Sequence, residues 1–363
     1  MRQNDILTII YIIAGESTMN ITILGIDLSK EVFQLHGVDK LGKAILKRTI
    51  RRSKLLEFMV NFPRCLVVME ACGSANFWSR QFKELGHEVK LISPQFVKPF
   101  VKGNKNDYQD AEAIVEAASR PSMRYVSPKT IAQQDMQSLL RMRESAIQMR
   151  TKISNQLRGL LAEYGVVMPR GLSRLRSFLS NLIDSDNADD LTIDFKQLLA
   201  MQYTMLLNLD DQINEFDKKV EWVASEREDC QRVKQVPGIG AITAVALAAT
   251  IGSPNDFKNG RHFAAFLGLV PRQHSSGGKE RLLGISKRGD SYLRQLLIHG
   301  ARSVLNRVDK KDDTRSHYLK NLKSRIGMNR TAVALANKNA RTVLAMLLKN
   351  EDFKSYHTDA LTA

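Results

Sequence analysis

ITILGID, at Ile21–Asp27, is the stretch that decides the fold, because it is a short run of β-branched and apolar residues that ends in a carboxylate. Such a run predicts a buried β-strand. After it, Lys30–Gly37 alternates as a second strand, and Ala44–Ile50 supplies a third. Tight polar turns separate the three strands, so the sequence predicts an antiparallel meander at the start of an α/β domain.

A further buried strand is predicted at Cys65–Met69, CLVVM, and it too is followed by a carboxylate, Glu70. A continuous apolar run of this kind is typical of a strand covered on both faces. The pattern also predicts a short helix at Ser53–Asn61, another at Gly73–Leu85 and a strand at Glu88–Ile92.

The segment KGNKNDYQDAEA, at Lys102–Ala113, places Asp107 and Asp110 three residues apart at the start of a predicted helix. Side chains at positions i and i+3 point the same way, so the pair forms one acidic patch. Lys102 and Lys105 precede it, and a helix start flanked by lysines suits a phosphate polymer. An acidic first turn that complements the helix dipole is the alternative.

Asp27 and Glu70 each follow the carboxyl end of a buried strand, where ligands and chemistry collect in an open α/β sheet. A simple helix cap is the alternative for either one. Three strands, a helix, a strand and then the acidic helix is the order of a ribonuclease-H-like fold. Four converging carboxylates, with Asp107 and Asp110, cannot all ionise comfortably without cations, so two Mg²⁺ or Mn²⁺ ions about 4 Å apart would suit them.

Charge and cysteine content narrow the class of protein further. The 363 residues carry a net charge of +16 with a pI of about 9.8, the footprint of a polyanion partner. The alternatives are a protein whose positive charge only keeps it soluble and a protein that binds a membrane surface. Cys65, Cys72 and Cys230 form no CxxC pair, which favours a reducing cytoplasm and argues against a zinc finger.

The first residues are expected to lie outside the folded domain. The apolar run Ile6–Ala14 is too short to cross a bilayer and lacks a basic flank, so a secretory signal is not expected. Residues 1–18 are interpreted as a disordered leader or as sequence before a true start at Met19. No later stretch is long and apolar enough to span a membrane, so no membrane partner is expected.

Pro121 and Pro128 mark a boundary, after which Ile131–Tyr164 has the pattern of one long amphipathic helix. The nucleic-acid contacts predicted on its basic surface are Arg141, Arg143 and Arg150. A second long helix is predicted at Ile193–Ala224, with heptad spacing from Leu206 onward that indicates a coiled-coil seam. The partner of this seam is either the first helix or another subunit.

The sequence VKQVPGIGAITAVALAATIG, at Val233–Gly252, predicts a helix, a sharp turn and an alanine-rich helix. Gly238 and Gly240 would expose backbone N–H groups at a helix start, which can grip a phosphate. The alternative is a packing turn that glycine allows because two helices approach closely.

A glycine-rich loop over Phe266–Asp290, FLGLVPRQHSSGGKERLLGISKRGD, contains Ser275 and Ser276. The surrounding cations, predicted to bind nucleic acid, are Arg272, Lys279, Arg281, Lys287 and Arg288. A serine hydroxyl here could meet a phosphodiester while arginines hold its developing charge, although a serine in a glycine loop is also an ordinary turn residue. The chain has no GxSxG elbow and no P-loop, which argues against a hydrolase of that type or an NTPase.

Taken together, the GID strand, VVMEAC, KNDYQDAEA, PGIG and SSGGKERLLGISKRGD resemble the one-hundred-ten family of bacterial insertion-sequence transposases, in order from about Ile21 to about Leu348. The resemblance implies a DEDD tetrad that binds Mg²⁺ or Mn²⁺, formed by Asp27, Glu70, Asp107 and Asp110. It also implies a catalytic serine, placed on Ser276 because it directly precedes glycine, with Ser275 left possible.

The implied function is a DNA recombinase that excises and inserts its mobile element. Its implied partners are DNA at the element ends and target, a structured noncoding guide RNA, and further copies of the chain, as a dimer or tetramer joined by the coiled coil. Two alternatives stay open: a Holliday-junction-resolving nuclease that uses water, and a non-catalytic nucleic-acid-binding scaffold.

The predicted organisation has a ribonuclease-H-like domain at 19–128, a helical coiled-coil region at 129–229 and a mostly α-helical transposase domain at 230–350. Residues 351–363 are expected to form a tail.

Overall fold

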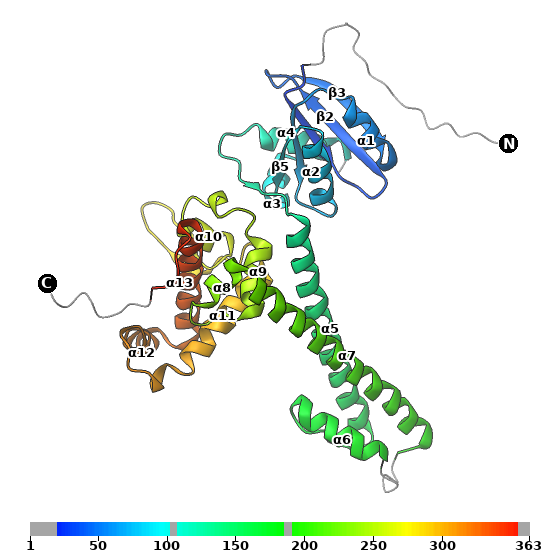
Figure 1. The fold of residues 1–363 in the computed structure, drawn as a ribbon, viewed down its shortest axis with the longest axis vertical. Helices are drawn as coiled ribbons and strands as arrows, with labels where there is room; N and C mark the ends of the chain where they lie inside the picture. Colours follow the sequence, from blue (N-terminus) through cyan, green and yellow to red (C-terminus); the bar gives the residue numbers. More distant parts are fainter. Residues whose placement is uncertain (1–19, 102–106, 185–190, 355–363) are drawn as a thin grey trace, which may run out of the picture. The chain divides into compact units, whose positions relative to one another are not determined.

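The computed structural model describes residues 20–101, 107–184 and 191–354, and the chain divides into two compact units between Thr130 and Ile131 (Figure 1). The first unit is a mixed α/β sheet domain, and the described part of the second is mostly helical, as predicted. The leader 1–18, Lys102, Lys105 and residues 355–363 of the predicted tail lie outside the described residues.

A six-stranded sheet in the order β3-β2-β1-β4-β5-β6 forms the centre of the first unit. Its strands are β1 (Ile23–Asp27), β2 (Val32–Val38), β3 (Ala44–Arg51), β4 (Leu66–Glu70), β5 (Glu88–Ile92) and β6 (Tyr125–Val126). The β1–β2 and β2–β3 pairs are antiparallel, β1–β4 and β4–β5 are parallel, and β6 pairs antiparallel with β5. Five strands were predicted to within two residues; β6 was missed because two residues carry no periodic pattern.

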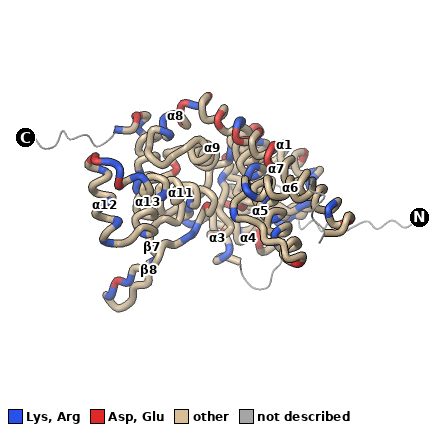
Figure 2. Tube along the Cα trace, turned by 90° about the horizontal axis from the view of Figure 1, so that it is seen from below, with Lys and Arg blue, Asp and Glu red and all other residues tan. Residues whose placement is uncertain are grey.

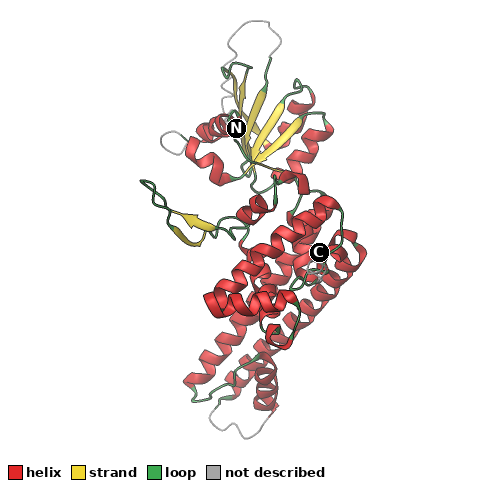
Figure 3. Cartoon of the chain, turned by 90° about the vertical axis from the view of Figure 1, so that its left-hand side faces the viewer, coloured by secondary structure: helices red, strands yellow, loops and turns green. Residues whose placement is uncertain are grey.

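Helices cover both faces of this sheet (Figure 3). On one face, α1 (Arg52–Val60) and α2 (Ala75–Glu84) pack over alternate β1 residues, Leu24 and Ile26. On the other face lie α3 (Pro94–Val97) and α4 (Asp107–Ala118), in a second core that also includes Ile23. Because successive side chains of a strand point to opposite faces, every second residue of a central strand faces α4.

The second unit is a bundle of helices with one small β-hairpin. Its elements are α5 (Ile131–Glu163), α6 (Leu172–Asp184), α7 (Ile193–Glu226), α8 (Glu228–Lys234), α9 (Ala241–Thr250), α10 (Gly260–Phe266), β7 (Pro271–Gln273), β8 (Leu282–Ile285), α11 (Ser291–Leu305), α12 (Thr314–Ile326) and α13 (Met328–Lys349). In the described ranges, no helix combines the length and the apolar character needed to cross a membrane.

The two long helices, α5 and α7, pack antiparallel within this chain (Figure 1). Arg143 forms a salt bridge with Asp217 at 2.5 Å, and Arg150 forms one with Asp210 at 2.8 Å. Residue numbers therefore increase along α5 where they decrease along α7. The predicted seam is buried in the same core as α5 residues, with Leu206 0% exposed. Of the two partners left open for the seam, the structure therefore provides the first helix.

Placing Asp at both Leu206 and Ile213 is expected to lower the free energy of unfolding by several kcal/mol, because both side chains are buried inside the monomer and a charge there is desolvated without a partner. Urea denaturation would measure the loss. The double variant Asn208→Asp and Asn214→Asp is the matched control, since both residues are exposed on the same helix and their replacement should change little. A seam variant as stable as the control would contradict an internal seam.

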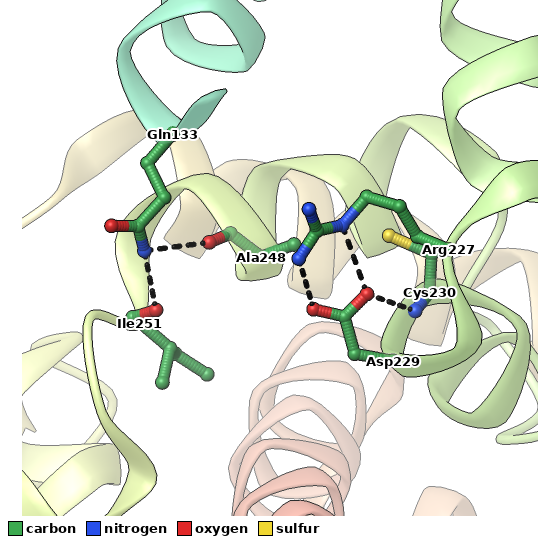
Figure 4. A network of polar contacts seen from close by, with 6 residues as sticks. All are labelled: Gln133, Arg227, Asp229, Cys230, Ala248 and Ile251. Carbon is green, nitrogen blue, oxygen red and sulfur yellow. Dashed lines mark hydrogen bonds and ion pairs between the residues drawn. The ribbon is translucent and has the colours of Figure 1, made fainter. Parts of the chain in front are cut away.

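The first turns of α5 and the last turns of α7 also belong to the core of the C-terminal helices. Met136, Leu140, Val220 and Ala224 are buried with residues of α8, α9, α11 and α13. Gln133 ties the two parts together, because its Nε2 donates to the carbonyls of Ala248 and Ile251 at the end of α9 (Figure 4). The predicted regions 129–229 and 230–350 therefore share one compact unit.

Candidate active site

Asp27 and Glu70 lie at the same edge of the sheet, at the carboxyl ends of the adjacent parallel strands β1 and β4. The last residues paired between β1 and β4 are Ile26 and Met69, and each carboxylate is the next residue of its strand. Each also belongs to the set of alternate residues that faces α4, in line with Gly25 on β1 and with Val68 on β4. The two predicted residues are thus brought together on one face.

Gly25 lets α4 come close to this edge. A Cβ on Gly25 would lie 2.5 Å from Val115 Cγ2 and 2.7 Å from the Ala111 carbonyl oxygen, so any other residue would push the helix away. Asp110 precedes Ala111 and is carried to the strand ends by this contact. Asp107 is the first residue of α4, one turn earlier, and its side chain lies outside the described set.

The other side of α4 is held to β3. The hydroxyls of Tyr108 and Thr49 hydrogen-bond at 2.7 Å, and Glu112 lies 3.8 Å from the ammonium of Lys47. The Tyr108–Thr49 hydrogen bond orients this side of the helix toward β3, and the exposed Glu112–Lys47 pair adds little. The acidic residue at 112 is therefore occupied with β3, unlike Asp110.

Asp27 and Asp110 lie close enough to Glu70 to interact with it electrostatically. Burial raises the pKa of Glu70 above its usual value, and the negative charges of Asp27 and Asp110 raise it further. The pKa of the neighbouring Cys72 thiol is raised in the same way, by burial and then by Glu70 and Asp27. Among the side chains that the structure describes, no group of three or more His, Cys, Asp or Glu residues is arranged to hold a metal ion; Asp107 is outside that set.

The PGIG turn between α8 and α9 is a site of close backbone approach. Gly238 has a φ of +96°, and its carbonyl oxygen would lie 1.8 Å from a Cβ placed on Gly300 of α11. The Asn339 amide on α13 donates to the Pro237 carbonyl at 3.0 Å. At the start of α8, the helix before this turn, Asp229 is held by Arg227 and accepts the Cys230 N–H (Figure 4). This geometry favours the packing alternative for Gly238, whereas Gly240 has open space around it.

Gly300→Ala and Gly240→Ala separate packing from phosphate binding. The methyl group at position 300 would clash with the Gly238 backbone, which is expected to cost about 3 kcal/mol of stability. This loss exceeds the gain of roughly 1 kcal/mol that Ala gives over Gly through its higher helix propensity. At position 240 the φ of −95° is ordinary, so stability should change by about 1 kcal/mol or less. Thermal unfolding checks both values, and wild-type stability in the Gly300 variant would contradict the contact. Lower nucleic-acid affinity in the Gly240 variant alone would support the hypothesis that the backbone at Gly240 binds a phosphate.

The serine loop forms an exposed β-hairpin with a rigid base. Near that base, Gly268 and Gly289 have positive φ, and a Cβ at either position would clash with the facing backbone. The Arg294 guanidinium of α11 donates to the carbonyls of Leu267 and Arg288, both at 3.1 Å. Beyond the base, every residue from 271 to 284 is exposed, and the hairpin extends from the helices (Figure 3).

Ser276 and Ser275 have different surroundings at the tip. Ser276 opens a two-glycine turn, in which Gly277 and Gly278 have φ of +57° and +76° and the Lys279 N–H donates to the Ser276 carbonyl. Positive φ at both central residues is the feature of a type I′ turn. The Ser275 hydroxyl accepts hydrogen bonds from Gln273 Nε2 at 3.0 Å and from the Arg281 N–H at 3.4 Å. The Ser276 hydroxyl has no hydrogen bond to any described residue.

The predicted arginine and lysine contacts to nucleic acid within the described residues fall into two groups. Those on or beside the hairpin are all exposed: Arg272, Lys279, Arg281, Lys287 and Arg288 (Figure 2). On α5, Arg141 is exposed, but Arg143 and Arg150 are only 14% and 19% exposed and pair with aspartates of α7. These two arginines hold the helical hairpin together, which sequence could not show because their partners lie 74 and 60 residues away.

The first unit thus carries carboxylates at its strand ends, and the second carries an exposed basic hairpin with a serine at its tip. Residues 230–318 match the family described as "Transposase IS116/IS110/IS902 family", and residues 24–166 match the DEDD transposase family of IS110 elements. The chain belongs to this IS110 family of insertion-sequence transposases, as the sequence motifs predicted.

Relatives extend this likeness over almost the whole chain. The transposase for insertion sequence element IS1111A of Coxiella burnetii is 49% identical over 93% of each chain. A probable family 20 transposase of Pseudomonas aeruginosa is 47% identical over 93% of this chain and 99% of its own. The transposase for element IS1328 of Yersinia enterocolitica is 42% identical over 89% of this chain and 95% of its own. DNA recombination for an insertion sequence is thus the activity of the class.

Proposed function

We propose that this chain excises and inserts its insertion sequence by metal-dependent phosphoryl transfer, with a serine as the nucleophile. The observation that carries the proposal is the shared face of Asp27 and Glu70 at the ends of β1 and β4, with Asp110 brought to it by α4. The strand order β3-β2-β1-β4-β5, with helices on both faces, supports a ribonuclease-H-like fold for the first unit.

The donor chemistry of these carboxylates suits a divalent metal such as Mg²⁺ or Mn²⁺, although the described carboxylates by themselves are not arranged as a metal site. Carboxylate oxygens are the ligands that these ions prefer, and the like charges that raise the pKa of Glu70 are what a cation would offset. Asp27, Glu70, Asp110 and Asp107 would hold it. When bound, such an ion stabilises charge on phosphoryl oxygens and makes a nearby water or hydroxyl a better nucleophile.

Ser276 is the proposed nucleophile. Its Oγ would form a bond to phosphorus while the bond from phosphorus to one bridging oxygen breaks, and the leaving oxygen takes up a proton. The exposed position of Ser276 and the cations on its hairpin support this role, because arginines and lysines stabilise the charge of the pentavalent phosphate.

The proposed partners are DNA at the element ends and target, a structured guide RNA encoded by the element, and further copies of this chain. Phosphate contacts would come from the exposed cations of the hairpin, from Arg141 and from Lys102 and Lys105. Because the heptad seam is filled within the chain, subunits would join through other surfaces. Leu198, Met201 and Met205 on α7 are exposed at helical spacing and suit such a contact.

Recombination of a plasmid that carries the element's ends, with and without the RNA encoded beside the gene, tests the proposal. The expected result is excision and insertion with Mg²⁺ and the RNA together, and none when either is left out. Cleavage that leaves free ends would instead identify a water-using nuclease. Binding with no strand cleavage in Mg²⁺ would identify a scaffold.

A further inference from the structure

A cavity of about 720 Å³ lies among α10, α12 and α13 in the helical unit. None of its lining residues belongs to the strand-end carboxylates, to the serine hairpin or to the PGIG turn. Its volume falls within the about 300–1,000 Å³ typical of sites for small ligands.

Four cationic side chains line this cavity, Arg261 from α10, Arg315 from α12, and Lys338 and Arg341 from α13. Among the described residues that surround it, there is no aspartate or glutamate. Like charges around one cavity repel each other and focus a positive potential into it. The cavity therefore favours an anionic ligand.

The rest of the lining is aromatic and apolar. Tyr318 is 53% exposed, and the Lys338 ammonium lies 5.3 Å from the centroid of its ring. Leu319, Leu322 and Leu335 are buried beneath and close the cavity with apolar surface. A ligand that fits carries both a negative charge and a flat apolar ring, as a nucleotide does.

The walls are fixed by contacts with the surrounding helices. A Cβ on Gly260 would lie 3.0 Å from Arg341 Cβ, so glycine lets the start of α10 rest against α13. The Arg315 guanidinium donates to Asn339 Oδ1 at 3.1 Å, and Asn339 in turn donates to the Pro237 carbonyl of the PGIG turn. The cavity is thus held in place from two sides.

We propose that this cavity binds one unstacked nucleotide of a nucleic acid, with its phosphate on Arg261 and Arg341 and its base on the ring of Tyr318. A base inside a duplex has both faces covered by its neighbours, so only an unpaired nucleotide in a bulge, flap or single-stranded end can offer a face to the ring. The inference rests on the proposed function in one respect, that the partner is a nucleic acid.

Fluorescence anisotropy with the full chain tests this with two matched probes, a fully paired duplex and the same duplex with one unpaired nucleotide, each made as DNA and as RNA. Wild-type protein is expected to prefer the bulged probe. Tyr318→Ala should weaken binding of that probe by about tenfold or more and leave the paired duplex unchanged, whereas Tyr318→Phe keeps the preference. The better of the DNA and RNA probes identifies the source of the nucleotide.

Arg341→Ala should also weaken binding of the bulged probe. Arg330→Ala serves as the matched control, because Arg330 is an exposed residue of α13 outside the cavity. A 5-iodouracil at the unpaired position is expected to crosslink to Tyr318, located by peptide mass. The proposal is overturned if wild type shows no preference, if both cavity variants bind the bulged probe like wild type, or if the crosslink maps elsewhere. A Tyr318 crosslink in a protein that fails the plasmid assay would overturn the proposed function and leave this site standing.

Discussion

Asp27→Asn and Glu70→Gln are each expected to abolish cleavage and joining of DNA strands while the protein stays folded and still binds DNA. Mutation of a residue that hydrogen-bonds to a metal ligand typically lowers metal affinity or activity by about 10–100-fold. Loss of a direct ligand should therefore lower the activity by more than about a hundredfold. The sheet needs the shape of these side chains and not their charge, since neither contributes to the apolar cores on either face. Strand transfer on a preformed substrate, followed over Mg²⁺ concentration, measures the effect.

Glu112→Gln is the matched control for the tetrad. It removes a carboxylate from the same helix as Asp110, but this carboxylate faces Lys47 on β3. Strand transfer should therefore stay within about threefold of wild type, because an exposed ion pair contributes little. Full activity in Asp27→Asn or Glu70→Gln would contradict the proposal that these residues are metal ligands.

Stability gives a second readout of the same cluster. The pKa of Glu70 is raised in the folded chain, so its ionised form is less favourable there than in the unfolded chain, and ionised Glu70 costs stability at neutral pH. Removing this charge in Glu70→Gln should leave the melting temperature in EDTA unchanged or higher. Added Mg²⁺ should raise the melting temperature of wild type and not of the variant.

Local patterns were sufficient to predict most elements of the first unit. Ile21–Asp27 and Cys65–Met69 predicted β1 and β4 because each apolar run is as long as a strand and stops at a carboxylate. The edge shared by Asp27 and Glu70 followed from strand direction alone. The role of Gly25 did not follow, because its contact with Val115 and Ala111 joins residues about 90 positions apart.

The second unit shows what composition cannot decide. Arg143 and Arg150 have the same sequence character as Arg141, yet only Arg141 is exposed, because two aspartates of α7 lie opposite the others. The heptad pattern identified a buried seam but not its partner, since spacing describes one helix only. The helix α6 was missed although its sequence has the amphipathic pattern of a helix, with Leu175 and Leu179 four residues apart and both buried. The cavity among α10, α12 and α13 has no local signal, because it depends on how distant helices pack.

Ser276→Ala is expected to remove both a covalent protein–DNA adduct and recombination, with a loss of about a thousandfold or more, because no other hydroxyl takes the place of a missing nucleophile. Wild-type protein with Mg²⁺ and a nicked substrate should leave an adduct that survives denaturation and maps by peptide mass to Ser276. The variant should keep its turn, since Ser276 contributes only its backbone carbonyl to the bond with Lys279.

Ser275→Ala is the matched control one residue away, and the hairpin explains why the two variants should differ. The Ser275 hydroxyl is exposed but already accepts hydrogen bonds from Gln273 and from the Arg281 N–H, so it supports the tip of the hairpin. Its loss should loosen the tip and keep at least part of both adduct and recombination. An adduct at Ser275 would move the nucleophile by one residue. Free DNA ends with undiminished activity in Ser276→Ala would show that water attacks the phosphate, and the serine mechanism would then be wrong.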